Sequence, residues 1–194
     1  MLKSLPSEIV QAIRLTFVFA VVTGLIYGVG MTGIIQVLFH GQANGSLIMK
    51  NGQIVGSTLI GQQFSADKYF QGRYSANGYD AGNSYGSNLG PSSQALIDRV
   101  ASSARTFRQA NGMGPNDQVP VDVVTGDFSG FDPNITEASA LLEVNRVAQA
   151  RGLDASKVRA LVEKHVHGRI LWIFGEQYVN VLEVNLALDN GEAG

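Results

Sequence analysis

Cysteine is absent from this chain of 194 residues, so the fold contains no disulfide, and no thiolate can act as a nucleophile or a zinc ligand. Charge is also scarce, because Asp, Glu, Lys and Arg make up only 15% of the residues. Fourteen Lys and Arg against sixteen Asp and Glu give a net charge of −2. That balance argues against a nucleic-acid-binding protein, which needs a clustered basic face. The length fits one domain of about 150 residues plus one further segment.

The shortage of charge has a local cause near the N-terminus. The run Leu15 to Phe39 contains no charged side chain, and Gln36 is its only strongly polar one. As a helix it would extend roughly 37 Å, enough to cross about 30 Å of hydrocarbon with some tilt. A cleaved signal peptide is the alternative, because Gly41 and Ala43 offer small residues at a cleavage position. Its apolar region would span only about 7–15 residues, however, so we expect a retained membrane anchor.

The flanking positive charges predict the orientation of this anchor. Lys3 and Arg14 precede the run, whereas Lys50 alone follows it closely. By the positive-inside rule, residues 1–14 are cytoplasmic, residues 15–39 form the transmembrane helix and residues 40–194 lie outside.

One face of the anchor has small side chains. They recur at every fourth position: Ala20, Gly24, Gly28 and Thr32. Such a row lets another helix approach closely, so we expect it to dock a partner helix in the membrane. Gln36 continues the row and would need a polar partner. The alternative is that glycine is simply common in membrane helices.

The rest of the chain mixes strand and helix patterns. Asn51-Gly52 predicts a type I′ hairpin over residues 47–56, with Met49 opposite Ile54. Residues 72–91, rich in Gly, Ser, Asn and Tyr, are expected to form a long loop.

Helix caps and apolar periodicity mark the remaining elements. Helices are predicted over 92–110, 136–152 and from 154 onward, with Ser92, Thr136 and Asp154 as N-caps, and strands over 119–125, 170–174 and 178–182. The inward positions are expected to be Leu96, Val100, Ala104 and Phe107 in the first helix and Val158, Leu161, Val162 and Val166 in and just after the third. Strands separated by helices predict one transmembrane helix followed by a single mixed α/β or α+β domain outside the membrane.

Few residues carry a recognisable reaction chemistry. The Walker phosphate loop, the dinucleotide-binding glycine motif and the serine elbow are missing, so we expect no bound cofactor and no catalytic residue. Ser65 and Lys68 match the S-x-x-K spacing of acyl-enzymes, which leaves a membrane-anchored hydrolase as an alternative. A ligand-binding module with its pocket in the tyrosine-rich loop is a third possibility.

Two further features bear on binding. His165 and His167 lie two residues apart, too few ligands for a zinc site, so no metal site is expected. Arg73, among glycines and tyrosines, could hold a partner's carboxylate bidentately, or it could pin its own loop.

Six phrases in order go beyond these general patterns. They are GSTLIGQQF (56–64), YFQGRYSA (69–76), GSNLGP (86–91), SGFDPNIT (129–136), NRVAQARGL (145–153) and VNVLEVNLALD (179–189). Together they resemble the C subunits of Kdp potassium-transporting P-type ATPases, the KdpC family. The resemblance covers nearly the whole chain, including the N-terminal helix.

The resemblance implies an accessory, non-catalytic subunit of a bacterial inner-membrane complex that imports K⁺ by ATP hydrolysis. Its partners would be the channel-like KdpA, the ATP-hydrolysing KdpB and the small KdpF, and the complex would use ATP, Mg²⁺ and K⁺. C subunits are described as needed for assembly and activity, and as catalytic chaperones that raise the ATP affinity of KdpB. Partner contacts outside the membrane are expected at Arg73 and at Gly86, Ser87 and Asn88. Because P-type ATP sites are cytoplasmic, an outside domain would act on ATP affinity indirectly.

Overall fold

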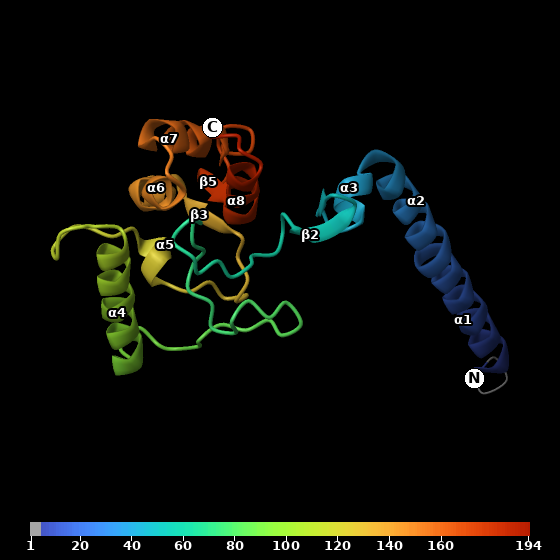
Figure 1. Ribbon diagram of the computed structural model, residues 1–194. Helices are drawn as coiled ribbons and strands as arrows, with labels where there is room; N and C mark the ends of the chain where they lie inside the picture. Colours follow the sequence, from blue (N-terminus) through green and yellow to red (C-terminus); the bar gives the residue numbers. More distant parts are fainter. Residues whose placement is uncertain (1–4) are drawn as a thin grey trace. The chain divides into compact units, whose positions relative to one another are not determined.

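The computed structural model describes residues 5–194 and divides the chain into two compact units, Met1–Ser46 and Leu47–Gly194 (Figure 1). Lys3, on which the predicted orientation partly rests, lies outside the described residues.

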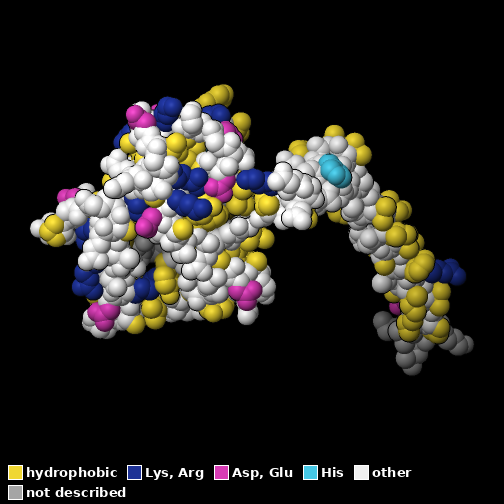
Figure 2. Space-filling model, viewed as in Figure 1, with side chains coloured by type: hydrophobic (Ala, Val, Ile, Leu, Met, Phe, Trp, Pro, Cys, Tyr) yellow, Lys and Arg dark blue, Asp and Glu magenta, His cyan; other side chains and the backbone are white. Residues whose placement is uncertain are grey.

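The first unit is helical. Its elements are α1 (Leu5–Phe19), the π-helical segment η1 (Ala20–Tyr27), α2 (Gly28–Leu38) and the short α3 (His40–Ala43). An 18-residue stretch of Pro6–Leu38 has a mean hydropathy of 2.1, and within residues 5–194 this is the one helix long and apolar enough to cross a membrane. Apolar side chains cover this helix in the space-filling view (Figure 2), as expected for contact with lipid.

The second unit begins with the predicted hairpin. Strands β1 (Leu47–Lys50) and β2 (Gln53–Ser57) pair antiparallel, and Met49 lies opposite Ile54. Asn51 and Gly52 have φ values of 53° and 78°, as a type I′ turn requires. The hairpin prediction is confirmed in both extent and register.

A small antiparallel sheet organises the core. Strand β5 (Tyr178–Asn180) lies between β3 (Asn134–Thr136) and β4 (Val166–His167). Helices α6 (Glu137–Arg151), α7 (Ala155–Lys164) and α8 (Val181–Asp189) lie around it (Figure 1). The apolar residues of these helices and of β5 form one continuous cluster with Phe70 and Ile135. An apolar N-terminal helix followed by this mixed unit confirms the predicted α+β class.

The predicted caps position two of these helices. The Thr136 side chain accepts from Ser139 N at 3.2 Å, and Asp154 accepts from Ser156 N at 2.7 Å. Gly152, at φ 66°, ends α6 in the left-handed conformation that glycine adopts without strain. Val158, Leu161 and Val162 are buried as predicted, and Val166 is half-buried.

Three strand predictions fail wholly or in part. Residues 119–125 contain the helical turn α5 (Val121–Val124), because Asp122 accepts from Thr136 N and Ser139 Oγ, both at 2.7 Å. Residues 170–174 form a tight exposed turn. Strand β5 stops at Asn180, whose Oδ1 accepts from Glu183 N at 3.2 Å and so caps α8. Helix α8 was missed because its apolar run also suits a buried strand.

Helix α4 (Gln94–Ala110) ends at Asn111-Gly112 as predicted, but it starts after Ser93 rather than Ser92. No residue of α4 is buried, so its predicted inward face is only half-covered: Leu96, Val100, Ala104 and Phe107. Its main contacts with another element are with α5 and not with the core helices α6, α7 and α8. Residues 72–91 contain no helix or strand, which confirms the predicted loop.

Candidate functional site

The predicted docking row lies on the apolar N-terminal helix and crosses a change of helical pitch. Ala20 and Gly24 belong to η1, whereas Gly28 and Thr32 belong to α2. A π-helix takes more residues per turn than an α-helix, so the row bends between its halves. A Cβ added at Gly24 or Gly28 would meet nothing within 4 Å, so the space beside both is open. The Thr32 hydroxyl donates to Gly28 O at 2.8 Å and is therefore satisfied within the helix.

Two other features of this helix were not predicted. Gln36 accepts from Asn44 Nδ2 at 3.1 Å, so its polar partner comes from the same chain. Gly30 and Gly33 line a shallow groove with Val29, Ile34, Val37 and Leu38. At about 100° per residue, Gly30 and Gly33 lie on the side of α2 away from Gly28. The helix thus offers two small-residue faces.

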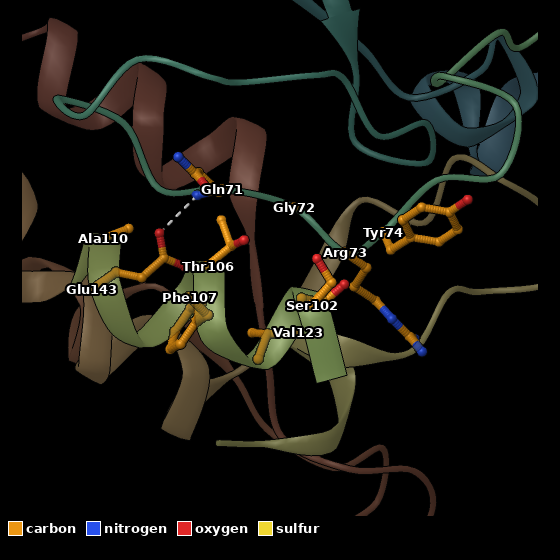
Figure 3. Close-up of a pocket in the computed structure, with 11 residues that line it drawn as sticks. Gln71, Gly72, Arg73, Tyr74, Ser102, Thr106, Phe107, Ala110, Val123 and Glu143 are labelled. Atoms are coloured by element: carbon orange, nitrogen blue, oxygen red, sulfur yellow. Dashed lines mark hydrogen bonds between the residues drawn. The ribbon is translucent and has the colours of Figure 1, made fainter. Parts of the chain in front are cut away.

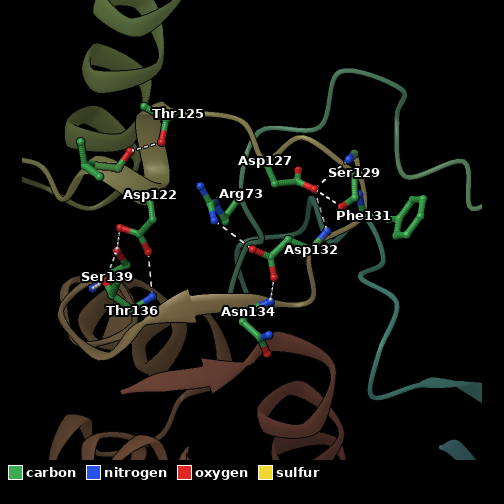
Figure 4. A network of polar contacts seen from close by, with 12 residues as sticks. Arg73, Asp122, Thr125, Asp127, Ser129, Phe131, Asp132, Asn134, Thr136 and Ser139 are labelled. Carbon is green, nitrogen blue, oxygen red and sulfur yellow. Dashed lines mark hydrogen bonds and ion pairs between the residues drawn. The ribbon is translucent and has the colours of Figure 1, made fainter. Parts of the chain in front are cut away.

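Arg73 pins its own loop to a carboxylate of the same chain (Figure 4). Its Nη1 lies 2.9 Å from Asp132 Oδ2, and both side chains are about a quarter exposed. Asp132 also accepts from Asn134 N at 2.9 Å, which ties the pair to the start of β3. Of the two roles considered for Arg73, the structure shows the loop-pinning one.

The loop before β3 folds around a second carboxylate. Asp127 Oδ2 accepts from Gly130 N at 2.7 Å and from Asp132 N at 3.3 Å, and it also binds the Ser129 hydroxyl (Figure 4). Tyr79 donates from its hydroxyl to Arg73 O at 2.6 Å. Burial, with the nearby carboxylates of Asp127 and Asp132, raises the pKa of Tyr79 to about 12. The phenol therefore stays protonated and holds the 72–91 loop in place.

The predicted partner-contact residues at 86–88 differ in exposure. Gly86 is buried, and a Cβ there would lie 3.2 Å from Phe128 Cα, a tight contact that a side chain could make only if Phe128 shifted slightly. Ser87 and Asn88 are exposed, and Asn88 has φ 52°. The two exposed residues are open to solvent, whereas Gly86 packs against Phe128.

The remaining sequence candidates are not brought together. Ser65 and Lys68 are exposed at a turn instead of lying on a helix, and no hydrogen bond joins these two described side chains. His165 Nδ1 lies 2.9 Å from Leu161 O, whereas His167 Nε2 lies 2.8 Å from Glu183 Oε2. Within residues 5–194, no group of three or more His, Cys, Asp or Glu side chains could hold a metal ion.

A buried ion pair on α6 is the main polar feature that the sequence reading missed. Glu143 and Arg146 are 1% and 8% exposed and contact each other. Arg146 also donates to Asp67 O at 2.6 Å and to Tyr69 O at 3.0 Å. Glu143 Oε2 accepts from Gln71 N at 3.0 Å. The signal was two opposite charges three positions apart on the same helix face as the apolar Ala140 and Val147.

Glu143 lines a cavity of about 260 Å³ between α4, α6 and residues 71–74 (Figure 3). The second oxygen of Glu143, Oε1, is buried without a hydrogen-bond partner. Burial raises the pKa of Glu143 to about 7, although Arg146 and the Gln71 N–H lower it. At neutral pH this carboxyl is therefore partly protonated, which lessens the cost of its unpartnered oxygen. Other lining residues are Ser102, Ser103, Thr106, Phe107 and Val123.

Comparison with known proteins gives a match over nearly the whole chain. The profile of the family described as "KdpC: K+-transporting ATPase, c chain" matches residues 9–190. A potassium-transporting ATPase KdpC subunit of Mycobacterium tuberculosis (strain H37Rv) is 46% identical over 184 residues, covering 94% of this chain and 97% of the relative. Its counterpart in Paraburkholderia phymatum is 48% identical over 180 residues, covering 91% and 93%. That of Bradyrhizobium diazoefficiens is 47% identical over 200 residues, covering 96% and 98%. The matched region runs from the apolar helix to the end of α8, so the chain belongs to the KdpC family of K⁺-transporting ATPase subunits.

Proposed function

We propose that this chain is the accessory, non-catalytic C subunit of a high-affinity, ATP-driven K⁺ import complex in a bacterial inner membrane. Its partners there are KdpA, KdpB and KdpF, and the complex as a whole uses ATP, Mg²⁺ and K⁺. The observation that carries the proposal is the family match over residues 9–190, which includes both the apolar helix and the α+β unit.

The membrane helix supports a docking role. Open space at Gly24 and Gly28 leaves room for the backbone of another helix, and small residues at the contact favour association within lipid. In the proposed topology, residues 1–14 are cytoplasmic, 15–39 span the membrane and 40–194 lie outside. Arg14, at the start of the apolar run, supports that orientation.

The α+β unit then acts from outside the membrane. Ser87 and Asn88 are exposed and form a contact surface for a partner subunit, while the Arg73–Asp132 ion pair fixes the start of the same 72–91 loop. Any increase in the ATP affinity of KdpB, the catalytic-chaperone role, arises by population shift. A subunit that binds one conformer of the complex more tightly raises the population of that conformer and with it the affinity of a distant site.

Co-purification tests the proposal. The tagged full-length chain is extracted from its native membrane with a mild detergent, and the accompanying proteins are identified by mass spectrometry. We expect an ATP-hydrolysing subunit and a channel-like subunit in stable complex with it. Recovery of the chain alone, from cells shown to express those subunits, would refute the accessory role.

A further inference from the structure

Five consecutive apolar residues protrude from the α+β unit between β4 and β5. Ile170, Leu171, Trp172, Ile173 and Phe174 have exposed fractions of 72%, 68%, 90%, 73% and 62%. We refer to these residues as the 170–174 loop. Large exposed apolar patches on a folded protein mark sites of interaction with another molecule or a membrane.

The backbone holds this loop in its protruding form. Ile170 and Phe174 exchange two backbone hydrogen bonds, each 2.9 Å long, and so close the base of the loop. Leu171 and Trp172, at the tip, have φ values of 53° and 61°. Residues with a side chain rarely adopt this left-handed conformation, and such positions are over-represented at functional sites. The exposure of Trp172 is therefore a property of a defined turn.

The composition of the loop matches the boundary between lipid and water. Tryptophan concentrates at that boundary because its ring is apolar while its N–H can still bond to water or headgroups. Arg169 precedes the loop, and its side chain is about half exposed. Its Nη2 lies 3.5 Å from Oε2 of Glu176, whose side chain is highly exposed. From there its guanidinium can reach lipid phosphates while the neighbouring apolar side chains enter the acyl region.

A lipid surface also suits the convex shape of the 170–174 loop and the short connection between the two units. A convex apolar tip needs a matching dry pocket in a protein partner, whereas a fluid bilayer closes around any small tip. The apolar helix ends at Leu38 and the second unit begins at Leu47, so a short connection keeps this unit close to the bilayer. Such a tether raises the effective concentration of the surface and strengthens an otherwise weak contact.

We propose that the 170–174 loop inserts into the interface of the bilayer that anchors the chain, with Trp172 at the level of the headgroups. This inference rests on the membrane anchoring in the proposed function. The loop then forms a second, shallow attachment that limits the motion of the α+β unit over the membrane.

The chain provides its own probe, because Trp172 is its only tryptophan. The full-length protein is reconstituted into vesicles of phosphatidylcholine and phosphatidylglycerol, with or without bromine on the acyl chains. Insertion predicts that bromination lowers Trp172 emission about twofold or more, and that the emission maximum is shifted to the blue, as for a side chain at interfacial depth. Leu171→Ser with Ile173→Ser should abolish most of this quenching.

A relocated tryptophan is the matched control. Phe128 is 80% exposed in a different loop, so Trp172→Phe with Phe128→Trp moves the single probe elsewhere on the same unit. We expect bromination to leave its emission unchanged. Equal quenching at both positions would overturn the proposal, because it would show contact without specificity for the loop.

Flotation of the vesicles separates the two levels of the inference. Protein that floats but whose Trp172 is not quenched keeps its anchor and refutes insertion of the loop. Protein that fails to float refutes the anchor, and the inference with it. A blue shift without quenching that arises only when partner subunits are present would assign the loop to a protein contact and overturn the proposal.

Discussion

The side-chain amide of Asn185 forms two hydrogen bonds with the backbone of Phe70, 115 residues earlier in the chain. Asn185 Oδ1 accepts from Phe70 N at 2.8 Å, and Asn185 Nδ2 donates to Phe70 O at 2.9 Å. Both residues are buried. Asn185 thus satisfies a stretch of buried backbone that has no strand beside it, and it attaches the irregular 58–93 segment to α8.

Asn185→Leu should destabilise the α+β unit by about 2–4 kcal/mol, because it leaves the buried N–H and C=O of Phe70 without partners. Chemical unfolding of the full-length chain in detergent, followed by circular dichroism, measures this loss. Asn190→Leu is the matched control, since Asn190 is exposed at the end of the same helix. Equal stability of the two variants would contradict the role of Asn185.

The Glu143 carboxyl should make stability depend on pH. Its folded pKa of about 7 lies above the ordinary value of 4.5, so the folded state binds this proton more tightly than the unfolded state. Below about pH 4.5 this proton binding adds up to roughly 3 kcal/mol to the free energy of unfolding. The contribution is lost as the pH rises through about 7.

Glu143→Gln removes this titrating group, so comparison with the variant isolates its effect on the free energy of unfolding. The free energy of unfolding of the original protein, minus that of the variant, should decrease between about pH 5 and about pH 8. The variant places a neutral amide beside Arg146 at every pH, so its own stability should not change through this titration. A difference that stays flat with pH would show that Glu143 does not titrate there.

The docking row on the apolar helix should govern assembly with the partner subunits. Gly24→Leu with Gly28→Leu fills the open space beside the row and should weaken co-purification with the partner subunits about tenfold or more, because close helix approach is lost. Gly30→Leu with Gly33→Leu makes the same change on the groove that lies away from Gly28. Loss of assembly in the second pair, but not the first, would move the docking face to that groove.

Variants of the Arg73–Asp132 pair distinguish the loop-pinning role of Arg73 from contact with a partner subunit. Arg73→Asp should destabilise the unit by about 1–2 kcal/mol, because two partly buried carboxylates then face each other. Arg73→Asp with Asp132→Arg restores opposite charges and should recover much of that loss. If the exchanged pair is stable yet fails to assemble, Arg73 contacts a partner as well.

The absence of cysteine makes the orientation directly measurable. Ser92→Cys should react with a membrane-impermeant maleimide added outside intact spheroplasts, whereas Gln11→Cys should react only after lysis. Both positions are exposed, so folding does not block the reagent. The reverse pattern would place the α+β unit in the cytoplasm and refute the proposed topology.

Local sequence signals were sufficient where one interaction between near neighbours decides the structure. The Asn51-Gly52 turn, the Thr136 and Asp154 caps and the Gly152 terminus depend on residues a few positions apart, and all four were predicted. The apolar helix was equally readable, because its length and lack of charge are properties of composition. For Arg73 the same signals left two roles open, binding of a partner's carboxylate and pinning of its own loop, and they did not identify Asp132 as its partner.

Contacts between distant residues decided the rest. Asp122 reaches Thr136 and makes a helical turn from a segment whose residues favour a strand. Glu143 and Arg146 are buried because the 67–71 backbone folds over them, and the 170–174 loop protrudes because β4 and β5 pair on either side of it. The sequence alone determined the apolar N-terminal helix, the Thr136 and Asp154 caps and the family. Only the tertiary structure decided which charges are buried and which apolar residues stay exposed, because burial depends on segments that meet only after folding.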